Sequence, residues 1–316
     1  MSSPFSFLEF TFEHRQPSPM ASGTVMAFPH PSPLTPHAVL KLGRFSLSLD
    51  RPLIMGIVNI TPDSFSDGGR HFDPKHALAH AMQLLEDGAD ILDIGGESSR
   101  PGAEPVAVDE ELRRVLPVLE KLGELPVPVS VDTWKPEVMR RAIAAGAAMI
   151  NDIFALRTQG ALDAVADSPV AVCLMHMQGE PSTMQQAPSY RDVVAEVEAF
   201  LAERAAAAIA AGIARDRIVL DPGFGFGKTP QHNLELIRAL PRLREARFPL
   251  LAGLSRKALF GKIIGREAAE RVHASAAGAL LAAQRGASIV RVHDVAATRD
   301  CLLVLRAMDD PTFSFP

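Results

Sequence analysis

Apolar runs typical of buried strands alternate with amphipathic helical segments from about residue 50 onward. We expect strands at 53–59, 89–95, 127–132, 147–152, 170–176, 217–221, 249–254 and 288–293. Helices are expected from Asp73-Pro74 to Gly88 and then at 109–122, 136–145, 160–167, 190–211, 231–240, 267–285 and 296–307. Each predicted strand is therefore followed by a predicted helix.

This alternation predicts the fold class. Strands linked by helices are parallel, and eight such units favour an α/β fold of the (β/α)8 TIM barrel type over an open, doubly wound sheet, which remains the alternative. Glycines at three helix-to-strand joints, Gly88, Gly146 and Gly286, fit left-handed helix ends. Alternating residues at 39–42 and 45–49 predict a short hairpin before the barrel.

The first 38 residues differ in kind from the rest of the chain. Pro, Ser and His are frequent there, and no helical or strand periodicity is present. We expect residues 1–38 to form a disordered N-terminal extension and residues 39–316 to form one barrel domain. Glu9 and Glu13, together with the lack of a continuous apolar run, argue against a secretory signal.

Composition excludes several classes of function. A net charge of −5 and a pI near 6.1 argue against a nucleic-acid partner. The chain has no apolar run near the roughly 18 residues that a membrane helix needs. Cys173 and Cys301 lack the spacing of a zinc site or a disulfide framework, so we interpret both as core residues in a reducing, cytoplasmic compartment.

The predicted strands end in polar residues. These ends are Asn59, Asp93, Asp132, Asn151, His176, Asp221 and His293. In a parallel barrel the carboxyl ends of the strands converge on the face where ligands bind. Two of them continue into polar loops, 61–70 and 95–102, which are either turn-rich connectors or active-site loops. The length of the first, beyond the usual 2–6 or so residues, favours the second interpretation.

Three of these strand-end residues suggest recognition of a heterocycle. Asp132, Asn151 and Asp221 could each cap the following helix, and a cap is as good an explanation as a site for Asp132. Together at a barrel mouth they would offer hydrogen-bond acceptors and an amide to a flat, nitrogen-rich ring. They could equally be magnesium ligands.

The segment 221–229, DPGFGFGKT, invites comparison with a phosphate-binding loop. The first glycine of that motif would fall at Pro222, so the motif is not met. The glycines would instead let the backbone approach a ligand, and Phe224 and Phe226 could offer ring faces to it. Either Phe taken alone is more often a core residue.

Basic side chains accompany the last two strands. Ser255, Arg256 and Lys257 follow the seventh strand, and Arg291 and His293 lie on one side of the eighth because they alternate. Phosphate groups in these barrels often bind at the loops after strands seven and eight. We therefore expect a cationic pocket there, with solvated surface charges as the alternative, and Arg100 as a further phosphate-binding candidate.

Eight segments, taken together and in order, resemble bacterial dihydropteroate synthases: NITPDSFSDGG, GGESSRPGA, SVDTWKPEV, IND, MHMQG, DPGFGFGK, GLSRK and RVHD. The resemblance spans about residues 50–308. It implies a transferase of folate biosynthesis that condenses 6-hydroxymethyl-7,8-dihydropterin pyrophosphate with 4-aminobenzoate, giving 7,8-dihydropteroate and pyrophosphate.

The resemblance also implies roles for individual residues. The pterin would be held by Asp132, Asn151, Asp221 and Lys257. The pyrophosphate would be held by Arg100, Arg291 and His293, with Asn59 helping to bind Mg²⁺. The aminobenzoate would be surrounded by Phe65, Ser98, Ser99, Pro101, Phe226, Ser255 and Lys257, where sulfonamides would compete.

The resemblance further implies a homodimer, and the residue types favour an SN1-like path. Mg²⁺ and the basic groups would stabilise the leaving pyrophosphate, while Asp132 and Asp221 would offset the cationic pterin methylene. Two alternatives remain: a methyltetrahydrofolate methyltransferase-like pterin barrel, which would lack the two pyrophosphate loops, and a catalytically silent pterin-binding paralogue.

Overall fold

The computed structural model describes residues 38–60, 74–99 and 102–314. The predicted N-terminal extension, except for residue 38, and the first polar loop lie outside these residues. So do three predicted site residues, Phe65, Arg100 and Pro101.

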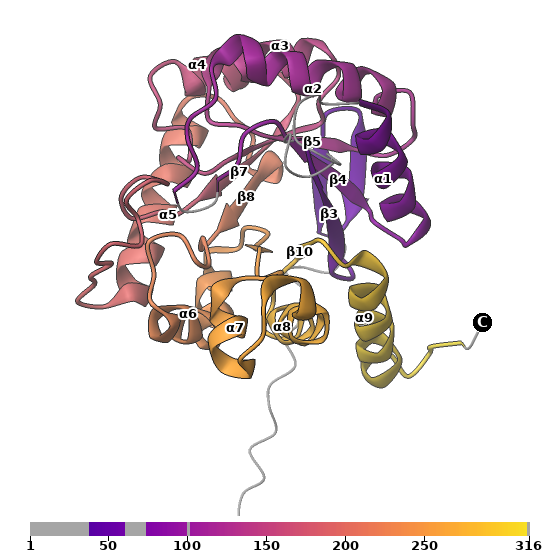
Figure 1. Cartoon of the computed structure of the whole chain (residues 1–316), viewed down its shortest axis with the longest axis vertical. Helices are drawn as coiled ribbons and strands as arrows, with labels where there is room; N and C mark the ends of the chain where they lie inside the picture. The colour runs from indigo at the N-terminus through magenta and orange to yellow at the C-terminus, as the bar shows by residue number, and fades with distance from the viewer. Residues whose placement is uncertain (1–37, 61–73, 100–101, 315–316) are drawn as a thin grey trace, which may run out of the picture. The chain divides into compact units, whose positions relative to one another are not determined.

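Eight parallel strands form the barrel that the alternation predicted (Figure 1). In chain order they are β3 (Leu53–Asn59), β4 (Ile91–Gly95), β5 (Val129–Asp132), β6 (Met149–Asp152), β7 (Ala171–Met175), β8 (Ile218–Asp221), β9 (Leu251–Ala252) and β10 (Ile289–Val292). Hydrogen-bonded neighbours follow the order β8-β7-β6-β5-β4-β3-β10-β9. A parallel bridge between Leu220 and Leu250 closes the seam between β8 and β9, which excludes the open sheet.

Helices surround the strands, as the view in Figure 1 shows. They are α1 (Pro74–Glu86), α2 (Val108–Leu122), α3 (Pro136–Ala144), α4 (Ala161–Ala166), α5 (Val193–Ala210), α6 (Pro230–Leu243), α7 (Ala258–Ile264), α8 (Val272–Gln284) and α9 (Val295–Asp309). Short 3-10 turns occur at Arg215–Arg217, Arg244–Ala246 and Ala268–Glu270. Gly88, Gly146 and Gly286 all have positive φ, near 100°, which confirms the predicted left-handed helix ends.

Several predicted boundaries shift for identifiable reasons. The helix expected from 190 begins only at Val193, because the side chain of Asp192 accepts hydrogen bonds from Val194 N and Ala195 N and caps it there. The seventh strand is only two residues long, and it follows Pro249, which has no backbone N–H to donate. Helix α7 was not predicted, and the helix expected at 267–285 begins at Val272.

Two apolar layers hold the barrel together. The larger lies between the sheet and its helices and includes Val58, Leu92 and Val290. The smaller fills the barrel interior with Met55, Met149, Ile289 and neighbouring side chains.

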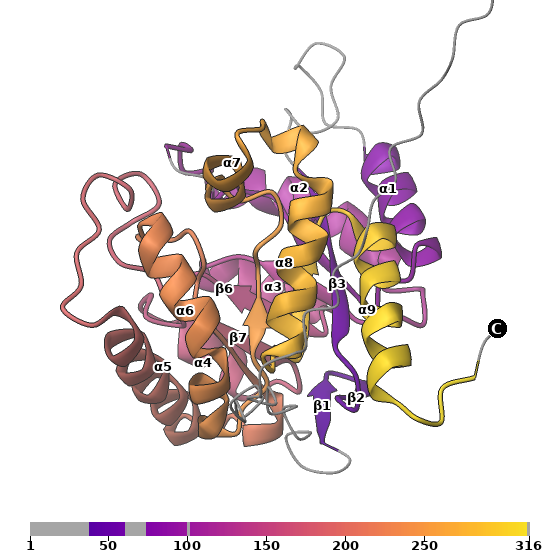
Figure 2. The ribbon, with the colours of Figure 1, turned by 90° about the horizontal axis from the view of Figure 1, so that it is seen from below.

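The predicted hairpin closes one end of this interior layer (Figure 2). Its strands β1 (Val39–Leu42) and β2 (Phe45–Ser48) pair antiparallel, and Leu40 and Leu42 are fully buried against the interior layer. The hairpin and the interior apolar layer fill this end of the barrel. Polar side chains that face the interior can therefore lie only at the other end.

Among the described residues, no helix is long and apolar enough to cross a membrane. The two cysteines are free; Cys173 is buried, as predicted, but Cys301 is only partly buried on α9, so the prediction that it is a core residue is wrong.

Candidate active site

Alternation along the strands determines which polar side chains face the barrel interior. Ile91, Met149 and Ile289 belong to the apolar layer that fills the barrel interior. The residues two positions further along the same strands, Asp93, Asn151 and Arg291, therefore point to the same interior, one layer nearer the carboxyl ends. Asp132 and Asp221 end their strands in the same layer, so the structure brings the predicted pterin residues together with Arg291.

Arg291 joins two carboxylates of this layer. Its Nε donates to Asp93 Oδ2 at 2.6 Å, and its Nη2 donates to Asp132 Oδ2 at 2.8 Å. Burial alone would lower the pKa of the guanidinium, but the two carboxylates hold it above its usual range. Asp132 is thus a partner of Arg291, and the alternative that it caps α3 is excluded, because the N-cap position is Lys135.

Burial leaves Asp132 poised to change its charge near neutral pH. Burial raises the pKa of Asp132 to about 7; Arg291 opposes this shift, and Asp93 adds to it. A carboxyl group with this pKa can be tuned by a ligand that donates a hydrogen bond to it or brings a charge nearby.

Asp93 is a site residue that the sequence interpretation did not assign. Its side chain is fully buried, and its Oδ2 also accepts a hydrogen bond from Asn151 Nδ2 at 3.2 Å. Its Oδ1 has no hydrogen-bond partner among the described residues. The signal that could have identified it is its place two residues after Ile91, on the interior face of β4.

Asp221 is the last residue of β8, and its carboxylate accepts a hydrogen bond from the turn that follows. Gly223 N donates to Asp221 Oδ1 at 2.7 Å, and burial raises the pKa of Asp221 to about 6. Only glycine fits at position 223, where φ is 68° and an added Cβ would lie 1.9 Å from the carbonyl oxygen of His176. The backbone therefore approaches closely here, as the glycine pattern predicted.

The buried side chain of Lys228 forms hydrogen bonds with this turn. Its ammonium contacts His176 Nδ1 at 2.9 Å and donates to the carbonyl oxygens of Gly223 and Phe226, both at 2.9 Å. Burial lowers the pKa of Lys228 to about 7, and burial together with Lys228 lowers that of His176 to about 3. These contacts support the rejection of a phosphate-loop role, since the ammonium serves the protein's own turn.

Lys257 and Phe226 form the other wall of the site. The Lys257 ammonium lies 4.2 Å from the centroid of the Phe226 ring. Phe226 packs with Met175, Met177 and Met184 in a small apolar cluster beside the barrel mouth. Phe224, in contrast, is a core residue, 1% exposed.

His293 and Ser255 are brought together across the last two strands. Ser255 Oγ accepts from His293 N at 3.2 Å and lies 3.0 Å from His293 Nδ1. These two contacts with one hydroxyl fix the orientation of the His293 ring beside Ser255.

The expected cationic pocket is in fact a mixed cluster of both charges. Arg256 forms a two-point ion pair with Asp294, Nε to Oδ2 at 3.0 Å and Nη2 to Oδ1 at 2.5 Å. Arg291 is likewise paired with carboxylates. The sequence could not reveal this, because each acidic partner is distant in the chain from the arginine that it pairs with.

The remaining predicted residues lie at the ends of β3 and β4. Asn59 is partly buried and pairs in register with Gly95, and Ser98 and Ser99 are partly buried just beyond β4. Among the described residues, no three His, Cys, Asp or Glu side chains converge as a metal site, so the magnesium-ligand alternative for Asp132 and Asp221 gains no support.

Comparisons with known proteins agree with this geometry. Residues 55–293 match the family described as pterin binding enzyme. A dihydropteroate synthase of Neisseria meningitidis serogroup B is 55% identical over 277 residues, which cover 85% of this chain and 97% of the relative.

Two solved structures are similar over nearly their whole length. Xanthomonas albilineans dihydropteroate synthase with 4-aminobenzoic acid superposes with a TM-score of 0.82 at 58% identity, covering 87% of this chain and 99% of that one. Burkholderia cenocepacia dihydropteroate synthase complexed with 7,8-dihydropteroate gives a TM-score of 0.80 at 52% identity, covering 86% and 96%.

Proposed function

Because the chain belongs to the dihydropteroate synthase family of pterin-binding enzymes, we propose that its barrel mouth forms 7,8-dihydropteroate from 4-aminobenzoate and 6-hydroxymethyl-7,8-dihydropterin pyrophosphate. The enzyme is thus a transferase of folate biosynthesis. The observation that carries the proposal is the Asp93–Arg291–Asp132 cluster, flanked by Asn151 and Asp221 in a buried polar layer.

The pterin would lie over this layer. Asp132 and Asp221 accept hydrogen bonds from its amino and ring N–H groups, and Asn151 can both donate and accept. Lys257, 4.2 Å above the Phe226 ring, would donate to the pterin from the opposite wall. Burial raises the pKa values of both carboxyl groups. N–H donors from the pterin would oppose that shift, because hydrogen bonds to a carboxylate favour its ionised form.

The pyrophosphate would occupy the side of the site nearest Arg291 and His293. Arg291 uses Nε and Nη2 for carboxylates, and its Nη1 makes no hydrogen bond within the described part of the chain. Nη1 and His293 Nε2 are the groups we assign to pyrophosphate oxygens, together with Arg100. These donors would stabilise charge that grows on the leaving group.

The reaction would proceed by an SN1-like displacement. The C–O bond to pyrophosphate breaks first, and Asp132 and Asp221 offset the positive charge left on the pterin methylene. The neutral amine of 4-aminobenzoate then forms the new C–N bond, and its proton passes to water or to the released pyrophosphate. No covalent enzyme intermediate is needed.

The aminobenzoate would lie against the apolar wall and the second polar loop. Phe226 would support its ring, and the other residues assigned to it are Phe65, Ser98, Ser99, Pro101 and Ser255. Sulfonamides would compete at the same place. The proximity of Phe226 to Lys257 supports a substrate that has both an aromatic ring and a carboxylate.

Mg²⁺ is the cofactor that we propose, with Asn59 as its protein ligand. The chemistry of the donor fits: an amide oxygen at the end of β3 suits a hard cation, and Mg²⁺ usually relies on substrate phosphates and water for its other positions. Once bound, the ion would supply charge stabilisation to the pyrophosphate.

We also propose a homodimer formed through α8 and α9, which pack side by side (Figure 1). Several apolar side chains on these helices are exposed: Leu281 at 43%, Leu303 at 40%, Val304 at 59% and Met308 at 81%. Sedimentation should show a dimer that Val304→Asp weakens, while Met82→Asp, which alters an exposed apolar residue of α1, should leave it intact. The free cysteines support a cytoplasmic location.

The experiment that tests the function is pyrophosphate release by the purified protein. Release should require the pterin pyrophosphate, Mg²⁺ and 4-aminobenzoate together, and a sulfonamide should inhibit it. Pterin binding without release would instead identify a silent paralogue or a methyltransferase-like barrel.

A further inference from the structure

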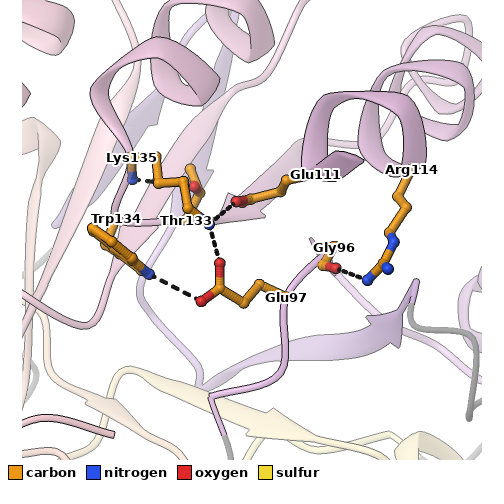
Figure 3. A network of polar contacts seen from close by, with 7 residues as sticks. All are labelled: Gly96, Glu97, Glu111, Arg114, Thr133, Trp134 and Lys135. Carbon is orange, nitrogen blue, oxygen red and sulfur yellow. Dashed lines mark hydrogen bonds and ion pairs between the residues drawn. The ribbon is translucent and has the colours of Figure 1, made fainter. Parts of the chain in front are cut away.

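A buried ionic network lies beside the pterin layer and outside the site described above (Figure 3). Lys135, just before α3, forms ion pairs with two carboxylates, Glu97 after β4 and Glu111 on α2. The three side chains are 8%, 14% and 1% exposed. Such a cluster is costly to desolvate and is therefore weak support for stability alone.

The two carboxylates come from different parts of the structure, one from a helix and one from a loop. Glu111 is part of the helical layer: burial raises its pKa, and Lys135 and Thr133 oppose that shift. Glu97 belongs to the loop that continues directly into Ser98 and Ser99. Lys135 therefore connects helix α2 to the loop segment assigned to the aminobenzoate.

Further contacts fix the base of the same loop. Trp134 Nε1 donates to Glu97 Oε1 at 3.4 Å, and Arg114 Nη1 donates to the carbonyl oxygen of Gly96 at 2.8 Å. A Cβ at Gly96 would lie 2.9 Å from Val115 Cγ2, so the loop base packs closely on α2. Backbone packing therefore holds the base of the loop, and Glu97 lies between that base and Ser98.

We propose that the Lys135–Glu97 ion pair is a positioning device for the aminobenzoate: it holds Ser98 and Ser99 in the orientation that receives this substrate, without itself touching either substrate. The inference rests on the proposed function. It assigns the pair to the second substrate alone, because Asp132, Asn151 and Asp221 are held by contacts that do not involve Glu97.

The test compares Glu97→Ala with Glu97→Gln and with Lys121→Met. Glu97→Ala removes the partner of Lys135, while Glu97→Gln keeps an acceptor oxygen at the same distance from the backbone. Lys121 lies at the exposed end of α2 and pairs with Glu124, which follows the helix. Lys121→Met therefore controls for the loss of a charge. Lys135→Met and its combination with Glu97→Ala complete a double-mutant cycle.

Glu97→Ala should raise the KM for 4-aminobenzoate about tenfold. Its affinity for a pterin, measured by calorimetry, should stay within about twofold of wild type. Glu97→Gln should recover most of the loss, and Lys121→Met should resemble wild type. In the double-mutant cycle, the variant that combines Lys135→Met with Glu97→Ala should have the same KM for 4-aminobenzoate as Glu97→Ala alone.

A spectroscopic readout checks the contact itself. Trp134 is the single tryptophan of the chain, and its N–H faces Glu97. Glu97→Ala should therefore change the emission of the free enzyme, and Lys121→Met should not. This readout remains available if Lys135→Met fails to fold.

Distinct outcomes overturn the two proposals. If wild-type protein releases no pyrophosphate with 4-aminobenzoate, the proposed function fails before any variant is compared. If wild type is active but Glu97→Ala keeps the normal aminobenzoate KM, or loses pterin affinity equally, the positioning role is wrong. Unchanged Trp134 emission in Glu97→Ala would also refute it.

Discussion

Arg291 Nε donates to Asp93 Oδ2 at 2.6 Å, across 198 positions of the chain. Asp93 is fully buried, whereas the side chain of Arg291 is 21% exposed. The buried carboxylate therefore holds the orientation of the more exposed guanidinium, whose proposed role is to bind the substrate. We regard Asp93 as a positioning residue for Arg291.

Replacing Asp93 with Asn tests this relationship. Asn has the same shape but no charge, so the hydrogen bond to Arg291 loses its ionic component, worth about 2 kcal/mol or roughly thirtyfold in rate. We expect kcat to fall by that order in steady-state assays of pyrophosphate release. Asp163→Asn, on the exposed face of α4, is the matched control. Wild-type turnover in Asp93→Asn would contradict the assignment.

Arg291→Ala should lower turnover more than aminobenzoate affinity. The proposed target of Arg291 is charge that develops on the leaving pyrophosphate, so we expect a loss in kcat of about a hundredfold. The variant also leaves Asp93 and Asp132 without their cation, which can cost about 3–5 kcal/mol of stability. Thermal unfolding must therefore be measured alongside the kinetics.

Arg291→Lys supplies the comparison for this variant. It retains a positive charge but cannot donate to both carboxylates in the same fork, so we expect an intermediate kcat. Unchanged turnover in folded Arg291→Ala would remove the residue from the mechanism.

Lys257→Ala should weaken pterin binding broadly. The ammonium lies over Phe226 and contributes favourably to the ionised form of Asp221, so its loss affects both a donor and the charge of an acceptor. Calorimetric titration with a pterin should show about a tenfold loss of affinity. Lys262→Ala, an exposed lysine on α7, should bind normally. Equal affinities in the two variants would argue against the role.

The fold was predictable because its signals are local. Alternation of apolar strands with amphipathic helices, together with glycines such as Gly146, defines the barrel without knowledge of any long-range contact. The short helix α7 escaped prediction because its seven residues are fewer than the roughly 11–18 over which helical periodicity can be judged. The exact bounds of the elements depended instead on proline and on capping, as where Asp192 sets the start of α5.

The site was only partly predictable. Asp132 and Asp221 end their strands, Asn151 lies one residue before the end of its strand, and that pattern is visible in the sequence. The pairing of Arg291 with Asp93, and of Lys135 with Glu97 and Glu111, depends on which strands and helices become neighbours. A charged residue in a loop looks solvated until the fold places an opposite charge beside it, so these networks required the structure.

Asp221 offers a test by pH. Burial raises its pKa to about 6, so in the free protein it is protonated below that pH and cannot accept two N–H donors. Pterin affinity should therefore fall as the pH is lowered through about 6. In Asp221→Asn this dependence should vanish, leaving only the change near pH 7 that belongs to Asp132.

Stability should respond to pH in the opposite direction. Because the folded pKa of Asp221 is raised above the unfolded value, near 3.9, its contribution to the free energy of unfolding is fully present below that value and is lost as the pH rises through about 6. Pterin binding must then release a proton near pH 6, since the ligand favours the ionised carboxylate. Calorimetry in two buffers of different ionisation enthalpy measures the protons released, and the same titration of Asp221→Asn separates the share of Asp221 from that of Asp132. Identical apparent enthalpies in the two buffers would show that Asp221 does not change its protonation when the pterin binds.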